Sequence, residues 1–243
     1  MARPATYLAL AVLLMAPKAP AWALEPPLEQ RLAQLDALRG DANVAAEVEV
    51  QGEDLLSRYK LPEDRTRIAF ELAHVLGQSD IRKHSAAVAK YTRLALEAEH
   101  DPIRRGTLHS YLASALLVDP ADDHFGRQRR RATEVWLDAY KELLALELPD
   151  TAPPLPVVPK LGPDFPDRVV REEAFRAQAA RMQARREAER IGQLVHHRDD
   201  VVRQLAEVYR RPPRADDELK PLVARVLGDS MSADALLARV LRD

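Results

Sequence analysis

Two adjacent histidines followed by acidic residues form the segment of this chain best suited to chemistry. His196 and Asp200 are four residues apart, so on a helix they share one face and have the spacing of two metal ligands. His197 points about 100° away from His196 on a helix, so the two imidazoles cannot chelate one ion. Two ligands do not make a site, and the sequence places no third beside them. We interpret this segment as a solvated polar face and expect no bound metal.

The densest basic run is a second candidate, because clustered arginines attract phosphates, acidic glycans and lipid headgroups. The arginines of this run are Arg127, Arg129, Arg130 and Arg131. Acidic residues flank the run on both sides, namely Asp119, Asp122, Asp123 and Glu134. Neutralising ion pairs are therefore favoured over a specific anion site.

Recognised catalytic motifs are absent from the sequence. It has no His-Glu-x-x-His, no Gly-x-Ser-x-Gly and no glycine-rich phosphate loop. The lack of cysteine also removes thiolate metal sites, cysteine nucleophiles and disulfides. We therefore expect no catalytic residue and no cofactor. An enzyme with an unrecognised site is the third interpretation, after two non-catalytic ones.

The composition favours a folded helical protein. The chain has 243 residues, of which 47% are apolar and 30% charged, which is enough apolar material for a core. Only 5% are aromatic and only eight are glycine, a balance that favours helices over strands. The net charge of −2 argues against generic nucleic-acid binding.

The N-terminus has the features of an export signal. Arg3 supplies a positive charge, residues 7–16 form an apolar run, and Ala21-Trp22-Ala23 offers small residues for a signal peptidase. The run is too short to span a bilayer, which needs about 20 residues, and no later run approaches that length. We predict a signal peptide over residues 1–23, cleavage near Ala23, and a periplasmic or secreted mature chain without a transmembrane segment.

A helical pattern recurs in the first half of the mature chain. After two predicted helices over 28–38 and 44–59, residues 70–76 and 110–116 both carry Leu-Ala-x-x-Leu, 40 residues apart. Each is followed by a turn and a second helix with a matching pattern. Those patterns are Ala87-x3-Tyr91-x2-Leu94 and Ala132-x3-Trp136-x2-Ala139. Small and large residues thus alternate on one stripe, which lets neighbouring helices approach closely.

These residues resemble the tetratricopeptide repeat, over roughly residues 62–149. Ala73 and Ala113 stand where the family usually has glycine, and the period is stretched from about 34 to 40 residues. The resemblance implies an all-α, antiparallel stack of helical hairpins that binds peptides on the face of its first helices. The residues facing that groove are expected to be Arg67, Phe70, His74, Thr107, Ser110 and Ser114. A plain helical-hairpin array with alanine at its crossings is the alternative that the same periodicity allows.

Four regions follow from the pattern of prolines and helices: the signal peptide, a helical-repeat domain (24–148), a Pro-rich linker or strap (149–166), and a C-terminal helical region (167–243). The last should contain a long helical segment over 167–210, whose continuity through Gly192 the sequence leaves open, and short helices over 217–227 and 232–241. Before Gly192 the long helix has an alanine seam flanked by Phe175 and Met182, and after it a wide aliphatic stripe. We expect the Pro-rich segment to fold back over Phe175 and Met182.

These features predict an exported, non-catalytic module that binds a protein or peptide partner. The alternative is a structural or self-assembling envelope component that pairs through helix 168–190. A monomer is favoured over a dimer, because alanine methyl groups bury little apolar area.

Overall fold

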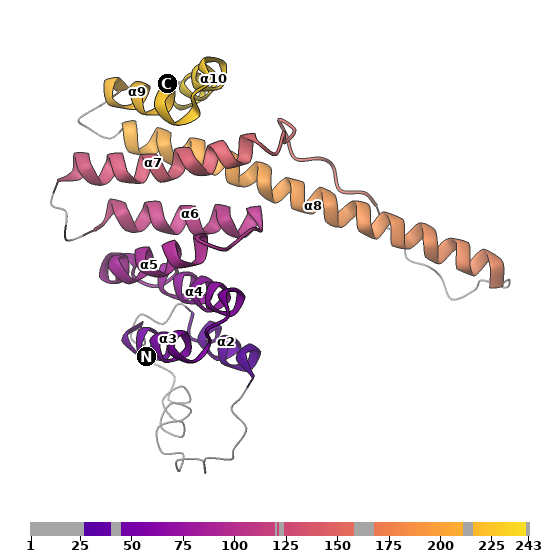
Figure 1. Ribbon diagram of the computed structural model, residues 1–243. Coiled ribbons are helices and arrows are strands. Elements are labelled where there is room, and N and C mark those ends of the chain that lie inside the picture. The colour runs from indigo at the N-terminus through magenta and orange to yellow at the C-terminus, as the bar shows by residue number, and fades with distance from the viewer. Residues whose placement is uncertain are drawn as a thin grey trace, which may run out of the picture. The chain divides into compact units, whose positions relative to one another are not determined.

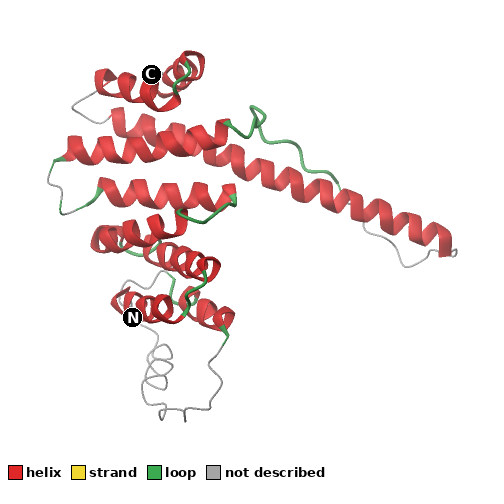
Figure 2. Ribbon diagram, viewed as in Figure 1, coloured by secondary structure: helices red, strands yellow, loops and turns green. Residues whose placement is uncertain are grey.

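The computed structural model describes residues 27–39, 45–119, 121, 124–157, 168–210 and 216–241 (Figure 1). Every regular element in these residues is a helix, and none is a strand (Figure 2). The predicted signal peptide and residues 158–166 of the Pro-rich segment lie outside the described residues. The chain divides into two compact units, residues 1–34 and residues 35–243. The expectation of an all-α protein is thus confirmed for the part of the chain that the structure describes.

The helix bounds lie close to those that the sequence pattern predicts. They are α2 (Leu28–Asp36), α3 (Ala45–Arg58), α4 (Pro62–Gly77), α5 (Ile81–Leu96), α6 (Pro102–Leu117), α7 (Phe125–Leu144), α8 (Arg168–Arg210), α9 (Asp216–Leu227) and α10 (Ser230–Val240). The largest differences are of two residues: α10 begins two residues earlier than predicted, and α2 ends two residues earlier. Asp229 is the N-cap of α10, and its carboxylate accepts from two backbone N–H groups.

The 40-residue periodicity recurs in the way α4 and α6 begin. Both start with a proline, Pro62 and Pro102, where the missing N–H has no intrahelical partner to lose. In the first turn of α4, Arg65 donates to the Leu56 carbonyl of α3 at 2.9 Å. Forty residues later, Arg105 donates to the Leu96 carbonyl of α5 at 3.1 Å. An arginine at the equivalent position of each helix therefore bonds a carbonyl at the end of the preceding helix.

Within residues 35–243 the helices pack in chain order. Each of α3, α4, α5, α6 and α7 contacts the helix that follows it, and α7 also contacts α9, which packs on α10 (Figure 1). In addition α4 contacts α6, and α6 contacts α8. The recurring small residues Ala73 and Ala113 are both fully buried, and the aromatic residues Tyr91 and Trp136 are buried with them. The predicted stripes therefore do face neighbouring helices.

The long helix α8 is continuous through Gly192 and, at about 1.5 Å per residue, measures roughly 65 Å. Its C-terminal part packs on α6, α7 and α10, and Leu205 in this part is fully buried. The described side chains between residues 172 and 187 are all exposed or half-buried. Phe175 is 58% exposed and Met182 is 39% exposed. The expectation that the Pro-rich segment covers these two side chains falls largely on residues 158–166, which lie outside the described residues.

The beginning of the Pro-rich segment lies against the middle of α8. Arg198 donates to the backbone carbonyl of Asp150 at 2.8 Å, and Ala152 lies beside Gly192. Further along, Leu155 and Val157 are exposed. These contacts hold residues 150–152 next to the middle of α8, away from its N-terminal part, where Phe175 lies.

Candidate functional site

The six residues predicted to bind a partner lie on α4 and α6, two helices in contact with each other. All six are half-buried, which leaves part of each side chain exposed to solvent. The structure brings together Phe70 and His74, whose rings stack with centroids 5.9 Å apart and an angle of 15° between their planes. Helical spacing explains this, because residues four apart lie one above the other on a helix.

Two residues that the sequence analysis missed extend this stack. The Arg104 guanidinium, from the first turn of α6, lies 5.4 Å from the centre of the Phe70 ring. The Tyr111 hydroxyl, further along α6, lies 2.7 Å from His74 Nδ1. We call the set Arg104, Phe70, His74 and Tyr111 the aromatic ladder. It joins α4 to α6 through planar groups that each keep a face or an edge near solvent.

The other predicted residues are not part of the aromatic ladder. Thr107 donates its hydroxyl to the Ile103 carbonyl at 3.2 Å, within its own helix. Ser110 and Ser114 are half-buried on α6, and none of the contacts in the described residues joins them to the ladder. The charge of Arg67 acts on Glu71, where it opposes the rise in the pKa that burial causes. The spacing nevertheless held a signal for Tyr111, which is four residues after Thr107 and three before Ser114.

The charges around the ladder are mixed. Burial raises the pKa of Glu71, and the negative charge of Asp36 adds to this, while Arg39, Arg104 and Arg67 oppose it. Burial also lowers the pKa of His74, with a further contribution from Arg39. The His74 ring is therefore neutral at pH 7, and its Nδ1 forms one hydrogen bond with the Tyr111 hydroxyl. Arg104 also forms an ion pair with Glu99 at 3.6 Å, and Arg39 forms one with Asp36, so the face presents arginines, carboxyl groups and uncharged planar rings.

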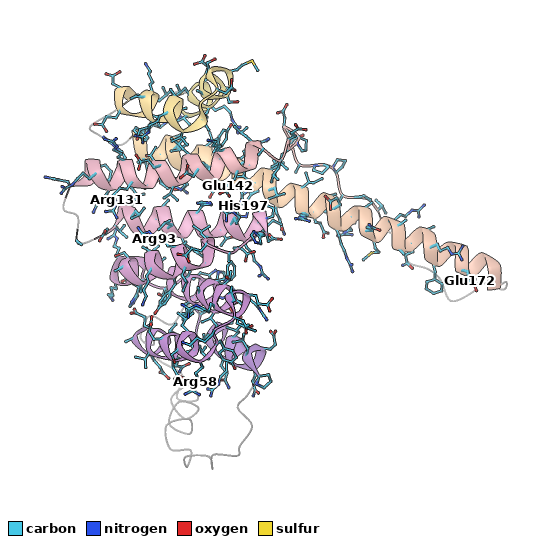
Figure 3. All side chains as sticks on the ribbon, viewed as in Figure 1. Arg58, Arg93, Arg131, Glu142, Glu172 and His197 are labelled. Atoms are coloured by element: carbon cyan, nitrogen blue, oxygen red, sulfur yellow. The ribbon has the colours of Figure 1, made fainter. Side chains whose placement is uncertain are left out.

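A second cluster borders a cavity of about 270 Å³ between α6 and α7. Arg105 donates to both oxygens of Glu142, with its Nε 2.8 Å from Oε2. His109, which is buried, has Nε2 3.3 Å from Glu142 Oε1, while its Nδ1 is buried without a hydrogen-bond partner. Gly106, which lines the same cavity, packs against His197 of α8; Figure 3 labels Glu142 on α7 and His197 on α8.

This cluster has the properties of a structural ion pair that stabilises helix packing. Burial on its own would raise the pKa of Glu142, but the hydrogen bonds and charges of Arg105 and His109 together lower it, so the carboxylate stays charged and paired. Burial lowers the pKa of His109, so its ring is neutral at pH 7. Arg105 also donates to the carbonyls of Leu96 and Glu99. Arg105 bonds both oxygens of Glu142 on α7 as well as the Leu96 carbonyl at the end of α5, so this cluster holds α5, α6 and α7 together.

The basic run forms ion pairs as expected. Arg131 lies 3.5 Å from Asp119, and Arg130 lies 3.6 Å from Glu134. Arg129 is buried between the Phe125 and Tyr209 rings and pairs with Glu218 at 2.8 Å. Asp122 and Asp123 lie outside the described residues. The pairing prediction is confirmed for Asp119 and Glu134.

Among the described side chains, no group of three or more His, Asp or Glu residues is arranged to hold a metal ion. The rings of His196 and His197 are 6.5 Å apart and tilted by 47°. No described helix combines the length and the apolar character needed to cross a bilayer. No family model, curated protein or solved structure matches the chain. Because no comparison informs the function, it has to be inferred from the side chains of the α4–α6 face.

Proposed function

We propose that the protein is a non-catalytic interaction module that binds a protein or peptide segment on the α4–α6 face. The observation that carries this proposal is the aromatic ladder, which is half-buried between the first helices of two successive repeats. Aromatic and arginine side chains that are held in place but still accessible are typical of binding surfaces.

The repeat geometry supports a tetratricopeptide-like stack of antiparallel hairpins. The equivalent turns held by Arg65 and Arg105, 40 residues apart, support two successive hairpins, α4–α5 and α6–α7. The contacts of α4 with α6 and of α6 with α8 support a row of first helices. In the family that this pattern resembles, such a row lines the peptide-binding face. The fold-level analogy gives the place, and the side chains give the chemistry.

The chemistry of the face favours a peptide with an aromatic or apolar residue and a nearby carboxylate. An aromatic residue of the partner can stack on the exposed parts of Phe70 and Tyr111. Arg104 attracts a carboxylate, since its side chain is 53% exposed and its ion pair with Glu99 is long, at 3.6 Å. Gln78, within 3.4 Å of Tyr111, can bond the peptide backbone.

Selection of peptides from a displayed library by the mature chain tests the proposal. Selected peptides should bind in solution, and Phe70→Ala or Arg104→Gln should each weaken binding at least about tenfold. Leu146→Ala is the matched control, because Leu146 is also partly exposed but lies after α7. Circular dichroism and thermal melting would establish that the variants are folded. Selected peptides whose affinity is unchanged by both substitutions would place binding elsewhere and refute the proposal.

Export is proposed on sequence grounds alone. Arg3, the apolar run over residues 7–16 and Ala21-Trp22-Ala23 support a cleaved signal peptide. N-terminal sequencing of protein from the cell envelope should start at Leu24. Envelope protein that still begins with Met1 would contradict this.

Self-association is the second candidate function, and the exposure of Phe175 and Met182 on α8 favours it. The two residues are seven apart, so they lie on the same side of the helix. Sedimentation of the mature chain at micromolar concentration distinguishes a monomer from a dimer.

A further inference from the structure

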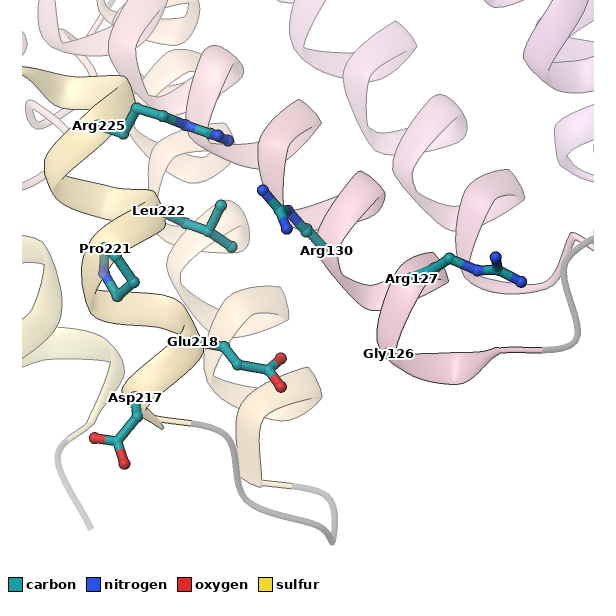
Figure 4. A pocket seen from close by; sticks show the side chains of 8 residues that line it. All are labelled: Gly126, Arg127, Arg130, Asp217, Glu218, Pro221, Leu222 and Arg225. Atoms are coloured by element: carbon teal, nitrogen blue, oxygen red, sulfur yellow. The ribbon is translucent and has the colours of Figure 1, made fainter.

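A groove of about 580 Å³ lies between α7 and α9, on other helices than the aromatic ladder. Figure 4 shows Pro221 and Leu222 on α9 along one wall and Gly126 and Arg130 on α7 along the other. Leu222 is buried and forms an apolar floor. The volume lies within the range of clefts that hold small ligands.

Two arginines converge on this groove from opposite walls. Arg225 of α9 lies 2.5 Å from Glu134 Oε1, and the Nε of Arg130 on α7 lies 3.6 Å from the same oxygen. Their side chains are 54% and 60% exposed, so most of their N–H groups still face solvent. Two positive charges therefore share one negative charge at this point.

The acidic residues of the groove do not cancel this excess. Glu218 is paired with the buried Arg129 at 2.8 Å. Asp217 lies at the N-terminal end of α9 and points away from Arg130 and Arg225 in Figure 4. The first turn of α7, next to Gly126, carries no acidic residue. The upper part of the groove is therefore electropositive above an apolar floor.

Two residues that disfavour helices line the same groove. Gly126 is the second residue of α7, and a Cβ added there would meet no atom within 4 Å. No neighbour among the described residues therefore requires glycine, although alanine would give a more stable helix. Pro221 lies inside α9, where it removes a backbone hydrogen bond. Neither residue carries a long side chain, so both walls of the groove are open at these points.

We infer that this groove binds a small amphiphilic anion. Its carboxylate or phosphate monoester lies between the guanidiniums of Arg130 and Arg225, which can donate paired N–H bonds to a planar or tetrahedral anion. Its apolar body lies along Leu222, Pro221 and the open space at Gly126. The site uses α7 and α9, so it is independent of the peptide face proposed on α4 and α6.

Isothermal titration of the mature chain tests the inference with decanoate and octyl phosphate, both below their micelle concentrations, and with decanol as the uncharged comparison. At least one anion should bind with one-to-one stoichiometry, and decanol should bind at least about tenfold more weakly. Arg225→Gln should weaken anion binding by a similar factor. Arg185→Gln is the matched control, since Arg185 forms an exposed ion pair on α8 and should leave binding unchanged.

Gly126→Leu separates binding from folding. The added side chain enters open space, so the variant should melt no lower than the wild type, yet it should block the groove and abolish anion binding. Binding of decanoate alone would identify the head group as a carboxylate, and binding of octyl phosphate alone as a phosphate. The inference is overturned by no binding of either anion, by equal binding of decanol, or by unchanged binding to Arg225→Gln or Gly126→Leu.

Discussion

The two ends of α8 are equally helical but differently surrounded. Between residues 172 and 187 the described side chains are exposed or half-buried, whereas Leu194, Val201 and Leu205 near the other end are buried against neighbouring helices. The exposed part is rich in alanine, arginine, glutamate and glutamine, which have high helix propensity. The buried part uses valine, which has lower propensity but packs well. Local preference maintains the helix at one end, and burial maintains it at the other.

Side-chain interactions show the same difference. The exposed part contains the short-range ion pair of Arg185 and Glu189 at 2.9 Å, one turn apart. The buried part makes bonds across the chain, such as that between the hydroxyls of Tyr209 and Thr133, 3.1 Å apart. Substitutions should therefore have large effects near the C-terminal end of α8 and small ones near its N-terminal end.

Leu205→Ala should have the largest effect of the substitutions on α8. Leu205 is fully buried, so truncation removes apolar contacts and leaves a cavity that helix packing fills only in part. We expect a loss of about 2–5 kcal/mol in the free energy of unfolding, measured by urea denaturation. A loss below about 1 kcal/mol would mean that this part of α8 is loosely packed, and the difference between its two ends would disappear.

Arg198→Met should have the next largest effect. Arg198 is buried and donates to the carbonyls of Leu148 and Asp150, so its loss leaves two carbonyls with fewer partners. We expect about 1.5–3 kcal/mol of destabilisation. The control Arg185→Met removes only an exposed ion pair and should cost about 0.5 kcal/mol or less. Equal costs for the two variants would show that the Pro-rich segment gains nothing from its attachment to α8.

Much of the fold could be predicted from the sequence, because prolines and periodic apolar residues mark helix bounds. Pro62 and Pro102 stand at the first positions of α4 and α6. The continuity of α8 through Gly192 could not be decided, since one glycine costs only about 1 kcal/mol and packing decides the outcome. The bond from Arg198 to the Asp150 carbonyl could also not be predicted, because it joins segments far apart in the sequence.

The candidate site was predictable only within single helices. Phe70 and His74 are four residues apart, so their stacking follows from helical spacing. Arg104 reaches Phe70 across two packed helices, and no spacing in the sequence encodes that contact. The pairing of Arg105 with Glu142 likewise depends on how α6 and α7 pack.

Of the two ends of α8, only the buried end should lose stability when the pH is lowered. His197 packs against Gly106 of α6, and burial lowers its pKa, with His196 adding to this effect and Asp200 opposing it. Its folded-state pKa lies below the unfolded value of about 6.5. The stability it contributes is therefore complete above pH 6.5 and is lost as the pH falls through the folded-state pKa.

Urea denaturation of the wild type and of His197→Gln between pH 7.5 and pH 5 would measure this loss. The wild type should lose more stability than the variant, which keeps only the similar contributions of His74 and His109. The residues between 172 and 190 include no histidine, so helix content there should not change over this range. Equal pH slopes for both proteins would contradict the role of His197.

Gly192→Ala should stabilise the protein slightly. A Cβ at residue 192 would lie 3.7 Å from the Ala152 Cβ, an ordinary contact, and alanine favours the helix by about 0.5–1 kcal/mol. Gly52→Ala is the informative comparison, because a Cβ at residue 52 would lie 2.4 Å from a Leu72 methyl group and force that side chain to move. A lower melting temperature for Gly192→Ala would mean that residue 152 lies closer to α8 than the structure has it.

Phe175→Ala should have the smallest effect on stability and is the sharpest test of the exposed end. Phe175 is 58% exposed, so truncation removes little buried area and should change the free energy of unfolding by no more than about 0.5 kcal/mol. Phe175 and Met182 are large apolar groups on an alanine-rich surface, and each buried methyl or methylene group of a partner would add only about 0.8 kcal/mol. We therefore expect a monomer in sedimentation, both before and after the substitution. A wild-type dimer that Phe175→Ala converts into a folded monomer would instead assign this end of α8 to self-association, and the exposed half would then be an interface.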